Sequence, residues 1–69
     1  MEVSARNQLE GTVKKITLGG VMAEVTIDIG DGKEVVAAVT RVSVENMHLS
    51  EGSPVVAIIK ATEVLIGKK

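Results

Sequence analysis

Evenly spaced glycine turns divide this chain into short segments, and they constrain its fold more than any other feature. Turns are indicated at Gly19-Gly20, at Gly30-Asp31-Gly32 and at Glu51-Gly52-Ser53-Pro54, because glycine supplies the positive φ angles that tight turns require. Between the first two turns, apolar and polar residues alternate strictly. The apolar positions are Val21, Ala23, Val25, Ile27 and Ile29. This alternation predicts a strand with one buried face.

A second alternating segment precedes the first turn. Leu9, Gly11 and Val13 alternate with polar neighbours, and the phase slips at Lys15-Ile16. A slip of this kind predicts a bulge or a strong bend in the strand.

Continuous apolar runs follow the second turn, at Val35–Val39 and Val55–Ile59, with a shorter run at Val64–Ile66. Such runs indicate strands that are covered on both faces. A barrel this small covers only its inner face, so the outer faces of these strands are expected to meet other subunits. The sequence therefore predicts an obligate oligomer.

The segment between Thr40 and Leu49 is expected to form a short helix. Ser43 is a plausible N-cap, and Glu45 in the first turn would suit the helix dipole. Val44, Met47 and Leu49 could seal one end of a barrel. We therefore predict an all-β fold and a single domain over residues 1–69: an OB-like five-stranded Greek-key barrel with one short helix between strands 3 and 4.

Composition excludes several classes of function. The chain has 69 residues, no cysteine, no aromatic residue and a net charge of −1, so disulfides and thiolate metal sites are ruled out and no basic block is present to hold nucleic acid. The longest apolar run is too short to span a membrane. The N-terminus lacks the features of a secretory signal. We expect a cytoplasmic protein without a nucleic-acid or membrane partner.

Catalysis and metal binding find little support in the sequence. No Ser-His-Asp order or isolated carboxylate pair is present, and His48, the single histidine, has no companion at metal-ligand spacing. Neither glycine turn is followed by the Gly-Lys-Ser/Thr of a phosphate loop. We expect no enzyme activity, no cofactor and no direct side-chain metal ligand.

A scattered set of hydrogen-bond donors gives a clearer indication of a binding site. Ser4–Gln8 is a polar cluster before the first strand, and Lys60 ends an apolar run. Thr40 and Ser43 place two hydroxyls near a helix N-terminus. Taken singly, these residues could be a solvated arm, a lysine reaching the edge of the fold, and two helix caps. Together they suit a tetrahedral dianion, whose oxygens only accept hydrogen bonds.

Three segments resemble molbindins, the molybdate-binding Mop domains. They are Ser4-Ala5-Arg6-Asn7-Gln8-Leu9, Val39–Val44 and Val56–Val64. The resemblance extends over the whole chain. It implies an OB-like barrel, a dimer built by exchange of N-terminal strands, a hexamer formed as a trimer of dimers, and molybdate or tungstate bound between subunits.

The resemblance also implies roles for individual residues. Ser4, Arg6, Lys60 and the N–H of Ala61 would contact the oxyanion, and Thr40 and Ser43 of a neighbouring subunit would complete the site. A second class of site near the threefold axis is part of the family pattern, with His48 at best a weak candidate for it.

Three functions follow as hypotheses. The first is storage or buffering of molybdate by a free-standing oligomer, since no DNA-binding or ATPase segment accompanies the domain in this sequence. The second is single-stranded nucleic-acid binding, which depends on aromatic stacking in a basic groove and so fits this chain poorly. The third is an interaction module with no anion role. Molybdate, tungstate and sulfate share charge and shape and differ mainly in size, so the residues alone indicate a tetrahedral oxyanion and leave all three open.

Overall fold

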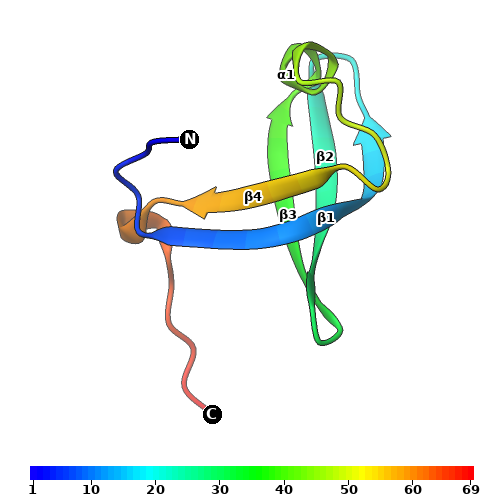
Figure 1. Cartoon of the computed structure of the whole chain (residues 1–69). Helices are drawn as coiled ribbons and strands as arrows, with labels where there is room; N and C mark the ends of the chain where they lie inside the picture. The colour runs from blue at the N-terminus through cyan, green and yellow to red at the C-terminus, as the bar shows by residue number, and fades with distance from the viewer.

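The computed structural model describes all 69 residues as a curled antiparallel sheet with one short helix (Figure 1). The elements, in chain order, are β1 (Asn7–Leu18), β2 (Met22–Gly30), β3 (Lys33–Thr40), α1 (Arg41–Asn46), β4 (Pro54–Ile59) and the 3-10 helix η1 (Ala61–Glu63). The order of the strands across the sheet is β3-β2-β1-β4. β3 and β4 therefore form the two edges.

β1 is long and bent, and its two halves have different partners. Its first half pairs with β4, from Asn7 opposite Ile59 to Thr12 opposite Pro54, and its second half pairs with β2. The register shifts between Val13 and Lys15, which confirms the irregularity expected near Lys15. Because of the bend, the β1–β4 ribbon crosses the β2–β3 hairpin (Figure 1).

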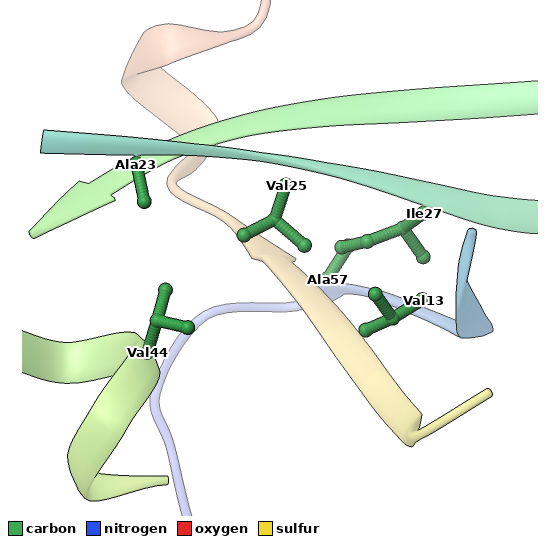
Figure 2. Packing of buried hydrophobic residues seen from close by; sticks show 6 residues of the cluster. All are labelled: Val13, Ala23, Val25, Ile27, Val44 and Ala57. Carbon is green, nitrogen blue, oxygen red and sulfur yellow. The ribbon is translucent and has the colours of Figure 1, made fainter. Parts of the chain in front are cut away.

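A small aliphatic core lies between the ribbon and the hairpin (Figure 2). Its buried members are Val13, Ala23, Val25, Ile27, Val44 and Ala57. The predicted inner face of β2 is thus confirmed at positions 23, 25 and 27. Val21 lies before β2 and is 76% exposed, so it does not extend this face.

The helix begins earlier than the sequence indicated. Thr40, and not Ser43, is the N-cap, since its side chain accepts a hydrogen bond from the Ser43 amide. Glu45 consequently lies beyond the first turn, where it faces Arg41 at 3.8 Å. Val44 is buried and Leu49 packs against the core, whereas Met47 is 64% exposed. Two of the three residues expected to seal the barrel therefore do so.

The prediction of a fifth strand is wrong for the single chain. Val64–Ile66 follows η1 without pairing to any strand, and Leu65 and Ile66 are more than 90% exposed. The apolar run indicated a strand covered on both faces, but in the single chain this segment is exposed. A strand, however, also needs a neighbour to satisfy its backbone hydrogen bonds, and the chain offers none where this segment lies.

The outer faces of the two edge strands are uncovered within the chain. Val36 on β3 is 58% exposed and Ile58 on β4 is 43% exposed. The chain itself thus covers only one face of each continuous apolar run. No helix is long and apolar enough to cross a membrane.

Candidate oxyanion site

Four of the six predicted site residues lie together at one end of the β1–β4 ribbon. The last residue pair of this ribbon is Asn7 opposite Ile59. Arg6 immediately precedes Asn7, and Lys60 immediately follows Ile59, so the antiparallel register places both cations beside the same pair. Ser4 lies two residues before Arg6, and Ala61 is the first residue of η1.

Two side-chain amides hold this end of the ribbon in place. Asn7 Nδ2 donates to the carbonyl oxygen of Ile59 at 3.2 Å, and Gln8 Nε2 donates to the carbonyl oxygen of Ala5 at 2.7 Å. The first bond ties the start of β1 to the strand that leads into Lys60, and the second is a local bond within the N-terminal segment that carries Ser4 and Arg6. Asn7 and Gln8 belong to the polar cluster Ser4–Gln8, but the sequence pattern indicated no role for them. Their position at the predicted start of a strand was the only available signal.

Neither cation at this end is neutralised within the chain. The salt bridges are Lys14–Glu34 and Arg41–Glu45, and Arg6 and Lys60 take part in neither. The hydrogen bond to Glu34 and the charge of that carboxylate raise the pKa of Lys14, so Lys14 is already committed to a carboxylate. Arg6 and Lys60 therefore remain exposed positive charges, available to an anion.

The remaining two residues form a hydroxyl pair where β3 meets α1. Thr40 Oγ1 and Ser43 Oγ lie 2.7 Å apart, and the Ser43 amide donates to Thr40 Oγ1 at 3.1 Å. The two hydroxyl groups have one proton each, and the hydrogen bond between them uses only one of these protons. The other proton is left to donate to an external acceptor.

The two groups of residues do not meet within one chain. α1 and the Thr40–Ser43 pair lie at one end of the hairpin, whereas η1 and the N-terminal segment lie at the far end of the ribbon (Figure 1). The candidate residues thus form two separate groups, which we call the cationic half-site (Ser4, Arg6, Lys60 and Ala61) and the hydroxyl half-site (Thr40 and Ser43). A ligand that touches both half-sites must lie between two copies.

Other chemistry-bearing residues do not gather into a site. No group of three histidine, cysteine, aspartate or glutamate side chains is placed to hold a metal ion. His48 is exposed and adopts a positive φ of 53° directly after α1. Its backbone conformation gives it a role in ending the helix.

The curled sheet and single short helix define a small, mostly-β domain, and comparison with known proteins identifies its family. The chain belongs to the TOBE domain family, which matches residues 3–66. It is 46% identical over 67 residues to a probable molybdenum-pterin-binding protein of Haemophilus influenzae, with 97% of each chain covered. It is 41% identical to molybdenum-pterin-binding protein 3 of Clostridium pasteurianum over 96% of this chain and 97% of that protein.

Solved structures agree with these sequence relationships. A molybdate-binding protein from Sporomusa ovata superposes with a TM-score of 0.91 at 47% identity, covering 99% of this chain and 100% of that one. The cytoplasmic molybdate-binding protein ModG superposes with a TM-score of 0.84 at 44% identity, over 88% of this chain and 43% of ModG. The resemblance to molbindins is thereby confirmed.

Proposed function

We propose that this protein binds molybdate between the subunits of a homo-oligomer and stores or buffers it in the cytoplasm without converting it. The relatives named for molybdenum-pterin or molybdate binding support the ligand. The separation of the two half-sites carries the proposal that the ligand lies between subunits. Each subunit would supply its cationic half-site to one anion and its hydroxyl half-site to another.

The chemistry of the two half-sites suits a tetrahedral dianion. Arg6 offers a planar fork of donors and Lys60 offers a compact point charge. The hydroxyls of Ser4, Thr40 and Ser43 and the N–H of Ala61 would add neutral donors. No carboxylate is paired with either cation to compete for it. Tungstate has the same charge and shape, and the proposal extends to it.

The apolar surface of the chain supports assembly. Val36 and Ile58 expose apolar side chains on the two edge strands, and a 69-residue chain without disulfides has a small core of its own. We propose the hexamer that the family resemblance implies, a trimer of dimers. The exchange of N-terminal strands stays a prediction, because in the single chain β1 pairs with its own β2 and β4.

Native mass spectrometry of the purified protein, with and without molybdate and with sulfate as control, tests this proposal. We expect a hexamer that gains discrete molybdate masses and ignores sulfate. A monomer that takes up nothing, or a hexamer that never gains molybdate, would contradict it.

Variants in the cationic half-site test the assigned residues. Lys60→Ala and Arg6→Ala each remove a charged donor, a loss of about 1.5–3 kcal/mol, so molybdate affinity should fall roughly ten- to a hundredfold. Lys33→Ala is the matched control, since Lys33 is an exposed lysine at the start of β3. Equilibrium dialysis gives the affinities. If Lys60→Ala and Lys33→Ala bind molybdate with equal affinity, Lys60 does not contact the ligand.

A further inference from the structure

The β1–β4 ribbon ends one residue pair before two positive charges would face each other. Its last pair is Asn7 opposite Ile59, so Arg6 and Lys60 occupy the next position of the antiparallel register. Like charges directly opposite each other destabilise a pair of strands. Neither charge takes part in a salt bridge within the chain. Without a bound anion, repulsion between the two cations therefore favours opening of the ribbon at this end.

One side-chain amide acts against this opening. Asn7 Nδ2 donates to the carbonyl oxygen of Ile59 at 3.2 Å. Among the side-chain hydrogen bonds of the chain, it alone joins β1 to β4. The amide of Gln8, the next residue of β1, bonds instead to the carbonyl of Ala5, three residues away in the same segment. Asn7 is thus the side chain placed to hold the two strands together beside the cations.

The Asn7 bond acts on the peptide group that leads into Lys60. The Ile59 carbonyl and the Lys60 nitrogen belong to one planar peptide unit, so the amide that holds the carbonyl also orients the Lys60 nitrogen. The carbonyl oxygen of Lys60 in turn accepts a hydrogen bond from the Glu63 amide at 2.9 Å. The Lys60 backbone is therefore held on both sides, whereas its side chain makes neither a capping bond to η1 nor a salt bridge.

We infer that Asn7 is a positioning residue for Lys60: its amide keeps the lysine beside Arg6 before the oxyanion arrives, and it does not contact the oxyanion itself. The inference rests on the proposed function and deepens it. Donors that are held in place before binding lose less freedom on binding, so the site binds more tightly. The constraint matters most in the ligand-free protein, because a bound dianion would attract both cations and offset their repulsion.

Hydrogen exchange in the ligand-free protein tests whether Asn7 fixes the Lys60 backbone. Asn7→Ala removes the donor at an exposed position, so the protein should still fold and assemble. The Glu63 amide is the probe, because its bond to the Lys60 carbonyl depends on the position of that backbone. We expect Asn7→Ala to raise the exchange rate of this amide at least threefold. Thr12→Ala, an exposed change at the other end of the same ribbon, is the control and should leave the rate nearly unchanged.

A double-mutant cycle on molybdate affinity tests whether Asn7 acts through Lys60. Equilibrium dialysis compares wild type, Asn7→Ala, Lys60→Ala and the double variant. We expect Asn7→Ala to weaken binding roughly three- to tenfold in the wild-type background, as the loss of one neutral hydrogen bond predicts. Where Lys60 is already alanine, the further loss should stay below about twofold. The salt dependence of the affinity should change with Lys60→Ala and not with Asn7→Ala, because Asn7 carries no charge.

Several results would overturn the inference. An equal loss of affinity in both backgrounds would mean that Asn7 acts independently of Lys60, for instance by contacting the oxyanion. Unchanged affinity or unchanged exchange at Glu63 in Asn7→Ala would mean that the Asn7 bond does not prepare the site. A loss of affinity that accompanies dissociation of the oligomer in native mass spectrometry would make Asn7 a structural residue only.

The same measurements separate this inference from the proposed function. If wild type binds molybdate and Asn7→Ala binds it equally well, the positioning role alone is overturned. If Asn7→Ala speeds exchange at Glu63 but wild type takes up no molybdate, the hold of Asn7 on the Lys60 backbone is supported and the proposed function is overturned.

Discussion

His48 ends α1 in a backbone conformation that glycine usually adopts. Its φ is 53°, and its amide donates to the Glu45 carbonyl while the Leu49 amide donates to the Val44 carbonyl, each at 3.1 Å. These two bonds form a Schellman motif, in which the residue after the C-cap is left-handed. The motif also brings Leu49 back toward the core beside the buried Val44.

Replacing His48 by glycine should therefore stabilise the protein. A residue other than glycine in the left-handed region costs roughly 1–2 kcal/mol of stability. Glycine removes this cost, but it also raises the conformational entropy of the unfolded chain, which offsets part of the gain. We expect His48→Gly to raise the free energy of unfolding by about 0.5–1 kcal/mol, measured in urea at constant protein concentration. Asn46→Gly, at an ordinary helical position of α1, should lower it by up to about 1 kcal/mol.

The same variant tests the weak assignment of His48 to a second anion site. If His48→Gly destabilises the protein, the helix-ending role is wrong. If it keeps its stability but binds fewer molybdate ions per oligomer than wild type, His48 belongs to an anion site as well.

At the scale of elements, the crossing of the β1–β4 ribbon over the β2–β3 hairpin depends on Gly11. A Cβ at this position would lie 2.5 Å from the Asp28 carbonyl oxygen and 2.7 Å from Ile27 Cγ2. The first of these atoms is backbone and has little freedom to move. Glycine is thus required where β1 passes Ile27 and Asp28 of β2.

Gly11→Ala should destabilise the fold by about 1–3 kcal/mol, the range for overpacking a well-packed site. Gly20→Ala is the control, because a Cβ there meets nothing within 4 Å, and surface changes of this kind stay within about 0.5 kcal/mol. Urea unfolding at equal protein concentration measures both. If the two variants lose similar amounts of unfolding free energy, the close approach at Gly11 does not contribute to stability.

At the scale of the whole molecule, assembly and ligand binding should be linked. A ligand that binds only the assembled state stabilises it by mass action, by about 2.7 kcal/mol for each site when free ligand is a hundredfold above Kd. We expect molybdate to raise the Tm in scanning calorimetry and to lower the concentration at which subunits dissociate, with sulfate having little effect. An assembled protein whose Tm is identical with and without molybdate would contradict interface binding.

Most local features were predictable from the amino-acid sequence, because alternation, glycine turns and apolar runs are local signals. The inner face of β2, the irregularity after Val13 and the presence of a helix after β3 were all predictable from neighbouring residues. The helix start was misplaced because Thr40 and Ser43 are both good caps. Only the backbone geometry decides between them.

The tertiary structure alone decided how the local pieces are placed. The antiparallel register brings Arg6 and Lys60 to the same residue pair although they are far apart in sequence, and the bend of β1 separates them from Thr40 and Ser43. It also decided that Val64–Ile66 has no partner in its own chain. The physical reason is common to all three: a sequence pattern records what a residue needs to bury or bond, whereas the partner that satisfies this need is set by the path of the whole chain.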